Sequence, residues 1–336
     1  MPLKKHPVRV YEYCSLIRDD ISLFVQSKRA IGYRYDTEAK MLARFDRYLC
    51  NVLTEDVSLS RECIEVFVEK TPWESPRNHM SRLLLIRQFC AWLRQNGGDA
   101  YVIPSGSLPK RNRDFIPYIF SNEEVSRLIH AADTLPYTER SPYRHITVPM
   151  IIRLLYCCGL RISEALSLTV GDVDLQNGIF HIYDSKFGKD RLLSMSDSLT
   201  VYCREYAMKI HSSSVKETPF LITSRGHGYA CKSAYNLYRV ILFNAGISHG
   251  GVGHGPRLHD LRHTFAVHRL RNWATSGVDI KAMLPFLSAY MGHTGLAGTQ
   301  TYLRLTADVF PHITDIMEAH FGSVIPEIGD EMYDNI

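Results

Sequence analysis

One histidine and one tyrosine near the C-terminal end could take part in chemistry. In the segment MGHTGLAGTQTYL, His293 precedes Tyr302 by nine residues, and mostly small or polar residues fill the interval. A turn through Gly292, followed by a short helix from about Thr294, would separate the two side chains by that helix and its entry. A phenol can act as a nucleophile, and an imidazole can bind an anion or accept a proton. The spacing alone leaves open whether Tyr302 packs or reacts.

A second group of chemically capable residues lies in the segment RLHDLRHTFA. His259 and Arg262 are three positions apart and His263 follows His259 by four, so the three share one face of a helix. The pattern His-Asp-x-x-His resembles the zinc-protease motif His-Glu-x-x-His, which makes a metal site one alternative. Against it, Arg262 would place a fixed cation between the ligands, and the sequence offers no convincing third ligand. A histidine and an arginine on one face suit an anion better.

Two further segments carry cations where the chain is expected to turn. In GLRISEAL, Arg161 precedes Glu164 by three residues, a spacing that fits either a surface ion pair or a guanidinium held in place for a phosphate. In SKFGKDRLL, Lys186 lies in a predicted turn between two strands and is followed by Lys189 and Arg191. Such a turn is either a solvated loop or a finger that carries an ammonium group into a DNA groove.

The composition indicates an ordinary folded protein of about two domains. The chain has 336 residues, of which 45% are hydrophobic and 22% charged, and its formal net charge is +4. This charge is too small to argue for nucleic acid by itself, but its distribution is more informative. Basic residues gather at Lys4, Lys5 and Arg9, at Lys110, Arg111 and Arg113, and at Arg257, Arg262, Arg269 and Arg271.

Cysteine usage and hydropathy indicate the compartment. The eight cysteines form no CxxC pair, and most lie among apolar residues. This pattern favours reduced, buried side chains over disulfides or zinc ligands. The sequence has no apolar run of membrane-helix length, and its basic start, MPLKKHPVRV, lacks the apolar stretch of a signal peptide. We therefore expect a cytoplasmic protein, nucleoid-associated if bacterial, with no membrane contact.

Helical periodicity dominates the first part of the chain and predicts an all-α domain over residues 1–103. Residues 104–118 combine Pro, Gly and Ser with Lys110, Arg111 and Arg113, which predicts a basic linker suited to lie along a phosphate backbone. The four helical patterns of the first domain occupy residues 15–30, 36–52, 60–70 and 75–98.

A second domain is predicted over residues 119–305. It opens with a capping box, Ser121 and Glu124, and continues as helices interrupted by three short strands. The predicted fold is therefore mainly α with a small three-stranded antiparallel sheet. Residues 306–336 are predicted to form a C-terminal helix and tail. The apolar stripe of that helix comprises Val309, Ile313, Ile316, Met317 and Phe321.

In order along the chain, four segments resemble the catalytic domain of the tyrosine recombinases, the phage-integrase family. They are GLRISEAL, SKFGKDRLL, LHDLRHTFA and MGHTGLAGTQTYL, and the resemblance covers residues 119–310. The combination is far more specific than any one segment. Residues 11–100 are similar to the helical core-binding domain of the same family, which has few fixed residues. GYRY followed by RFDRYL resembles integrases carried by transposons and other mobile elements.

The resemblance assigns a role to each candidate residue. It implies that Arg161 and Arg262 bind the phosphate, that Glu164 supports the first arginine, and that Tyr302 is the nucleophile. One departure is LLSMS after the hairpin, where a proline is common in the family. The remaining catalytic positions fall on Lys186, His259 and His293, and auxiliary DNA contacts are expected from Lys110, Arg111, Arg113, Lys189 and Arg191.

The implied function is site-specific recombination of DNA. The family cleaves and rejoins DNA through a covalent 3′-phosphotyrosine, without metal or cofactor, and the mobile-element likeness implies integration or excision. Implied partners are double-stranded DNA and a homo-tetramer on synapsed sites, with a monomer or weak oligomer off DNA and accessory DNA-bending or directionality proteins. The alternatives are relaxation of DNA by a type IB topoisomerase-like enzyme and, from a different class, a non-catalytic DNA-binding regulator. Family members pass a C-terminal segment to a neighbouring protomer, so the terminal helix docks either there or on its own domain.

Overall fold

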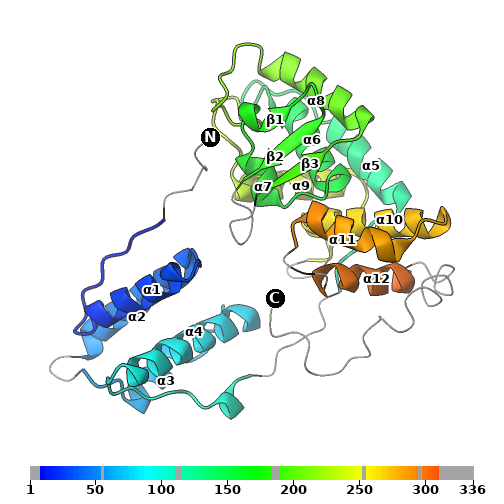
Figure 1. The fold of residues 1–336 in the computed structure, drawn as a ribbon. Coiled ribbons are helices and arrows are strands. Elements are labelled where there is room, and N and C mark those ends of the chain that lie inside the picture. The colour runs from blue at the N-terminus through cyan, green and yellow to red at the C-terminus, as the bar shows by residue number, and fades with distance from the viewer. Residues whose placement is uncertain are drawn as a thin grey trace. The chain divides into compact units, whose positions relative to one another are not determined.

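A computed structural model describes residues 8–53, 57–109, 116–183, 190–251, 255–293, 295 and 297–309. The chain divides into two compact units at Phe115 and Ile116 (Figure 1). The predicted linker residues Lys110, Arg111 and Arg113 and the hairpin lysines Lys186 and Lys189 lie outside the described residues.

The first unit is a group of four helices with an aromatic core. Ser75 caps the last of them by accepting a hydrogen bond from the backbone N–H of Asn78, and proline occupies the next position, where its missing N–H costs nothing. Phe24, Phe45 and Phe89 are fully buried and pack edge to face. The predicted helices are confirmed as α1 (Arg18–Ala30), α2 (Asp36–Val52), α3 (Arg61–Val68) and α4 (Pro76–Gln95), followed by a short 3₁₀ turn, Ser105–Ser107.

The second unit is also mainly helical and contains the sheet. The capping box is confirmed: Ser121 accepts from the N–H of Glu124, whose carboxylate accepts from the N–H of Ser121. The helices are α5 (Asn122–Asp133), α6 (Arg144–Cys157), α7 (Ile162–Ser167), α8 (Asp197–Ile210), α9 (Cys231–Asn244), α10 (Asp260–Thr275), α11 (Ile280–Met291) and α12 (Ala297–Val309), with a 3₁₀ turn at Val170–Asp172.

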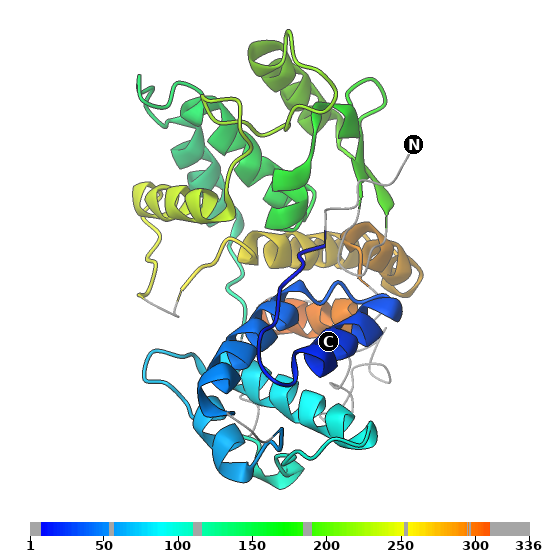
Figure 2. The ribbon, with the colours of Figure 1, turned by 90° about the vertical axis from the view of Figure 1, so that its left-hand side faces the viewer.

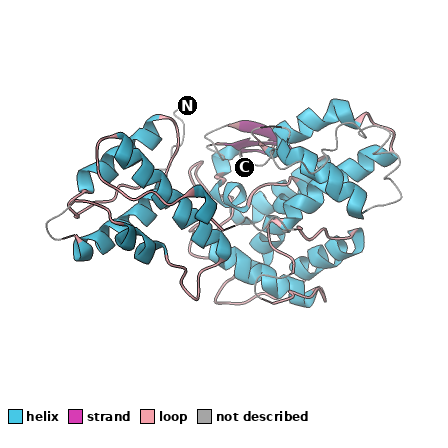
Figure 3. Cartoon of the chain, turned by 90° about the horizontal axis from the view of Figure 1, so that it is seen from below, coloured by secondary structure: helices cyan, strands magenta, loops and turns pink. Residues whose placement is uncertain are grey.

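Three short strands form one antiparallel sheet, as the sequence predicted (Figure 3). They are β1 (Val173–Asp174), β2 (Ile179–Ile182) and β3 (Arg191–Ser194), in the spatial order β1-β2-β3. Phe180 pairs with Leu193 across β2 and β3, and both side chains are buried in the main core of the unit. The sheet therefore places the start of β3, and with it Arg191, next to the core.

The last three helices of the second unit build a second apolar cluster. In Figures 1 and 2, α10 lies between α6 and α12. Tyr302, Leu303 and Leu305 of α12 are buried against α10 and α11. The predicted domain boundary between residues 305 and 306 falls inside α12, where Thr306 is also buried. Among the described residues, no helix has the length and apolar character needed to cross a membrane.

Candidate active site

Arg262 joins the first turn of α10 to two other parts of the second unit. Its side chain is 2% exposed and donates hydrogen bonds to the backbone oxygens of Gly159, before α7, and of Met291, at the end of α11. His259 occupies the N-cap position of α10, and His263 lies one turn further on. The positive end of a helix thus carries an arginine and two histidines, an arrangement suited to a phosphate.

A buried carboxylate, Glu164, holds one arginine on each side. Nη1 of Arg161 donates to Oε1 of Glu164 at 2.7 Å, and Arg191 donates to both carboxylate oxygens at 3.0 and 2.9 Å. Burial would raise the pKa of Glu164, but the hydrogen bonds and charge of Arg191, with those of Arg161, outweigh it and lower the pKa to about 2. Glu164 is therefore an anion that fixes the Arg161 guanidinium in one position.

Gly292 is the point at which α11 meets both of these arginines. It ends the helix with φ 67°, the left-handed conformation that favours glycine, and its carbonyl accepts from Nη2 of Arg161 at 2.9 Å. A Cβ at this position would lie 2.7 Å from Nη1 of Arg191. The backbone conformation therefore favours glycine, and a side chain here would displace the Arg191 guanidinium.

Tyr302 lies in α12 with its hydroxyl directed at α10. The residue is 4% exposed, and its Oη lies 3.1 Å from Nδ1 of His263. The two rings are inclined at 52° with centroids 5.6 Å apart. Thr306, one turn later in the helix, donates to the backbone oxygen of Tyr302 at 2.6 Å. The phenol is thus held by one specific imidazole within a well-packed helix pair.

His293, which follows the end of α11, also contacts the Tyr302 ring. The two rings stack with centroids 6.0 Å apart and an interplanar angle of 20°. Nδ1 of His293 lies 2.7 Å from Oγ1 of Thr299, a fully buried residue on α12. The backbone N–H of His293 also donates to the oxygen of Ser288, which continues the end of α11 into the site. These contacts fix the imidazole between α11 and α12.

Burial and nearby arginines keep the three histidines neutral. Burial, the neighbouring His259 and Arg262 lower the pKa of His263 to about 3, and burial with Arg262 and Arg161 lowers that of His293 to about 3. His259 is exposed, but desolvation by the protein atoms around it, with the charges of Arg262 and Arg161, lowers its pKa to about 4. The three rings are therefore neutral at physiological pH, and they become better proton acceptors only when added negative charge, such as a bound phosphate, raises their pKa values.

The two remaining groups respond to burial in opposite ways. Burial lowers the pKa of Arg262 to about 10, with the nearby charge of Arg161 acting in the same direction, so the guanidinium remains a cation near pH 7. Burial raises the pKa of Tyr302, while the charge and hydrogen bonding of Arg262 and the charge of Arg161 oppose this rise. Deprotonation of the phenol therefore requires a base beside it.

The structure brings together most of the residues that the sequence singled out. The site combines residues from four elements: the start of α7, the start of α10, the end of α11 and the middle of α12. These residues are Arg161, Glu164, His259, Arg262, His293 and Tyr302. Lys186 and Lys189 lie outside the described residues, so their predicted roles stay predictions.

Arg191 is placed differently from the DNA contact that the sequence suggested. Its side chain is 10% exposed, and beside its two bonds to Glu164 its Nε donates to the backbone oxygen of Tyr290 at 2.9 Å. Three of the five guanidinium N–H groups are thus engaged by the protein. Arg191 holds Glu164 in this structure, and a DNA contact by its other N–H groups stays a prediction.

His263 is the residue that sequence reasoning left without a role. Its spacing of four from His259 was the available signal, because it places both rings on one face of α10, and their centroids lie 4.8 Å apart. The zinc-protease alternative does not fit this placement, since Nδ1 of His263 faces the Tyr302 hydroxyl and the buried Arg262 cation lies between the two histidines in sequence. Within the described ranges, the one group of three or more potential metal ligands that lie close together is Cys14, Asp46 and Cys50, in the first unit.

Comparison with known proteins decides the family. Residues 119–308 match the model of the phage integrase family. The chain belongs to the phage integrase family. A relative named integrase/recombinase y4rB, from Sinorhizobium fredii, is 30% identical to this integrase-family chain over 294 residues, which cover 86% of this chain and 93% of the relative.

Two solved structures share the fold of this integrase-family chain. The first is the XerH site-specific recombinase bound to a palindromic difH substrate in a post-cleavage complex, with 17% identity and a TM-score of 0.61 over 89% of this chain and 84% of the other. The second is the Tn1549 transposon integrase in complex with transposon right-end DNA, with 15% identity and a TM-score of 0.58 over 84% of this chain and 94% of the other. The predicted family and fold class are therefore confirmed.

Proposed function

We propose that the protein is a site-specific DNA recombinase that cleaves and rejoins DNA through a covalent 3′-phosphotyrosine at Tyr302. The observation that carries the proposal is the phenol of Tyr302, held 3.1 Å from a neutral imidazole and close to the charge of Arg262. A tyrosine that only packs needs neither the base nor the cation. Family membership supports the same chemistry.

The phosphate site is formed by Arg161, Arg262 and His259. Phosphodiester transfer builds negative charge on the non-bridging oxygens, and two fixed guanidinium groups neutralise that charge without a metal. Arg161 is 19% exposed and His259 reaches solvent, so these two groups meet the DNA first. Arg262 is buried behind them and acts at close range, where its charge is least screened.

Strand cleavage exchanges one bond at phosphorus and moves two protons. The Tyr302 oxygen attacks phosphorus, its proton passes to Nδ1 of His263, and the bond from phosphorus to the 5′ oxygen breaks. Lys186 donates a proton to the departing 5′ oxygen. Rejoining reverses these steps with the same groups. Because Tyr302 is 4% exposed, α12 must shift when DNA is bound so that the phenol reaches the phosphate.

Double-stranded DNA is the proposed substrate, and a homo-tetramer on two synapsed sites is the proposed active assembly, with accessory DNA-bending or directionality proteins as further partners. The DNA-bound state of the XerH and Tn1549 proteins supports the first of these. The family and the relative named as an integrase/recombinase support integration or excision of a mobile element over relaxation of DNA. We also propose that the protein works in the cytoplasm, on the nucleoid if the host is bacterial.

A two-site assay tests this function against its alternatives. A plasmid carrying two copies of the end sequence of the gene's own element should yield recombinant circles, and a plasmid carrying one copy should yield none. Relaxation of a one-site plasmid without any recombinant product from the two-site plasmid would favour a topoisomerase. Binding to both plasmids without cleavage of either would favour a regulator.

A further inference from the structure

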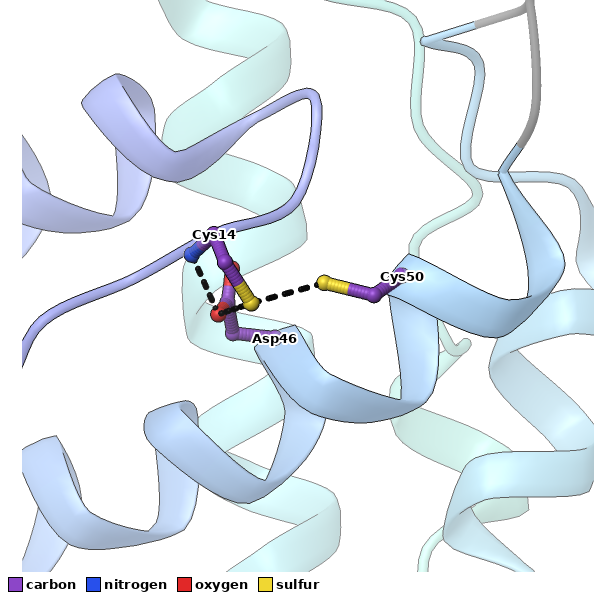
Figure 4. Close-up of side chains that lie close together, drawn as sticks. All are labelled: Cys14, Asp46 and Cys50. Carbon is purple, nitrogen blue, oxygen red and sulfur yellow. Dashed lines mark hydrogen bonds between the residues drawn. The ribbon is translucent and has the colours of Figure 1, made fainter.

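Two thiols in the first unit lie close enough to react with each other. Cys14 precedes α1, Cys50 lies in the last turn of α2, and their sulfur atoms are 2.8 Å apart (Figure 4). Both residues are exposed. The thiols belong to positions 36 residues apart in the sequence, so the fold and not the local chain brings them together.

Asp46 fixes Cys14 in this position. Asp46 is one helical turn before Cys50 on α2, so its carboxylate and the Cys50 thiol face Cys14 together (Figure 4). The carboxylate is buried, and its Oδ2 accepts from the backbone N–H of Cys14 at 2.7 Å and from the Cys14 thiol at 3.3 Å. Its Oδ1 accepts from the backbone N–H of Ser15 at 3.0 Å. Hydrogen bonds to Cys50 and Asp46 raise the pKa of Cys14 to about 12. The Cys14 thiol is therefore protonated at neutral pH. Burial would raise the pKa of Asp46, but the hydrogen bonds from Ser15 and Cys14 outweigh it and lower that pKa, so the carboxylate stays ionised.

A metal ion fits this cluster less well than a sulfur–sulfur bond. Structural zinc sites are closed by four ligands, whereas Cys14, Asp46 and Cys50 supply three. Two sulfurs bound tetrahedrally to one zinc at about 2.3 Å lie roughly 3.8 Å apart. The observed separation of 2.8 Å is shorter and closer to the about 2.05 Å of a disulfide. The Asp46 carboxylate is also already engaged by two backbone N–H groups.

The other described cysteines differ from this pair in burial or in partner. Cys63, Cys90, Cys158 and Cys203 are buried, and Cys157 is half-buried. Cys231 is exposed, but among the described residues it has no second thiol in contact and it begins α9 in the other unit. An oxidant in solution therefore meets one exposed pair and one exposed single thiol in the described part of the chain.

We propose that Cys14 and Cys50 form a reversible intramolecular disulfide by exchange with a small-molecule disulfide such as oxidised glutathione. The Cys50 thiolate attacks the glutathione disulfide, which gives a mixed disulfide on Cys50 and releases one glutathione thiolate. Cys14 then gives its proton to the released glutathione thiolate and attacks the Cys50 sulfur, which releases the second glutathione. The two cysteines are oxidised together and one oxidised glutathione is reduced to two thiols. The bond ties the segment before α1 to the end of α2.

Thiol mapping on the full chain tests this proposal. The protein is equilibrated in glutathione buffers of increasing oxidised fraction, quenched with an alkylating reagent, and examined by peptide mass spectrometry. We expect Cys14 and Cys50 to lose alkylation together at one midpoint, with an intact mass lower by about 2 Da and a melting temperature raised by several degrees. Cys231 should instead stay alkylated or carry one glutathione.

Single variants separate the pair from its surroundings. Cys14→Ser should leave Cys50 as a mixed disulfide that gains one glutathione, and Cys50→Ser should leave Cys14 reduced, while the matched control Cys231→Ser should oxidise like the natural chain. The proposal is overturned if both cysteines of the natural chain remain alkylatable, or each carries its own glutathione, in the most oxidising buffer. It is also overturned if one equivalent of Zn²⁺ protects both thiols from alkylation and from oxidation. The thiol mapping of the natural chain tests the proposal even if a variant does not fold.

Discussion

His263 differs from the two other histidines of the site in what its ring contacts. Its Nδ1 faces the Tyr302 hydroxyl at 3.1 Å, whereas Nδ1 of His293 faces Thr299 at 2.7 Å. Burial and the nearby charges lower the pKa of His263 to about 3, so the ring is neutral. The negative charge of a bound phosphate would raise that pKa and make the ring a better acceptor for the phenolic proton. We therefore expect His263 to affect the attack on phosphorus more than the binding of DNA.

Replacement of this imidazole tests that expectation. His263→Gln should lower the rate of covalent adduct formation by about 100-fold while leaving DNA affinity nearly unchanged, because proton acceptance is lost and no phosphate ligand is removed. Single-turnover cleavage and a binding titration measure the two effects. The matched control is His268→Gln, since His268 lies on the same helix and contacts a different tyrosine hydroxyl, that of Tyr156, at 3.0 Å. Equal rate losses in the two variants would show that His263 acts only by packing.

At the scale of elements, Glu164 joins α7, β3 and α11. Its carboxylate binds Arg161 and Arg191, and those arginines donate to the backbone oxygens of Gly292 and Tyr290. Removing one partner from a buried ionic cluster leaves the others uncompensated. The stability of the second unit should therefore depend on Glu164 more than on any exposed ion pair.

Glu164→Gln should lower the free energy of unfolding by about 3 kcal/mol, because two largely enclosed guanidinium groups lose their buried counter-charge. Asp133→Asn is the control, since the Asp133–Arg153 pair, at 2.7 Å in the same unit, is more exposed, and its loss should cost about 1 kcal/mol or less. Urea unfolding at neutral pH measures both. Similar losses in the two variants would mean that the Glu164 cluster does not organise the site.

The histidines at the start of α10 and the end of α11 also make stability depend on pH. Their folded-state pKa values are lowered to about 4 for His259 and about 3 for His263 and His293, below the roughly 6.5 of an unfolded histidine. The unfolded chain therefore binds protons first as pH falls. Stability is complete above about pH 6.5 and is lost as pH drops from there towards 4 and 3.

The free energy of unfolding should fall between pH 6.5 and 5, and His263→Gln should reduce that slope by roughly 1 kcal/mol per pH unit, because one of these groups is gone. Urea titrations at several pH values measure the slope. His227→Gln, which alters a histidine exposed in a turn, is the control. An unchanged slope in His263→Gln would contradict the neutral state inferred for His263.

Local patterns predicted the elements better than they predicted the contacts between them. Apolar spacing and the Ser121–Glu124 capping box predicted helices and the three strands, because those signals depend on residues a few positions apart. The sequence also predicted that His259 and Arg262 share one helix face, because they are three residues apart. The sequence did not predict that Arg191 binds Glu164, because the two residues are 27 positions apart and only the packing of β3 against α7 brings them together. The contact of Tyr302 with His263 could not be predicted either, because it depends on how α12 packs against α10.

At the scale of the whole molecule, the chain is two compact units with separate cores. The resemblance of the first unit to the core-binding domain implies that both units contact DNA, and this stays a prediction. The predicted C-terminal stripe at Ile313, Ile316, Met317 and Phe321 lies outside the described residues. Since α12 runs to Val309, a truncation that spares the site must begin after that residue.

Truncation after Val309 should leave a protein that binds one DNA site and forms the covalent adduct but cannot hold two sites in a synapse. The reason is that a segment donated to a neighbouring protomer joins the tetramer without belonging to the site. Gel-shift and two-site recombination assays measure the two properties. Recombination at the normal rate would exclude exchange between protomers, and unfolding would show that the segment covers its own unit.

The most direct measurement of the central claim is the covalent bond itself. The protein is incubated with a nicked suicide substrate made from the ends of the gene's own element, and the DNA-linked peptide is identified by mass spectrometry. We expect the 3′-phosphate on Tyr302, no adduct from Tyr302→Phe, and unchanged DNA binding by that variant, because only the nucleophilic oxygen is removed. A phosphate mapped to another residue, or adducts that persist in Tyr302→Phe, would contradict the assignment of Tyr302 as the nucleophile.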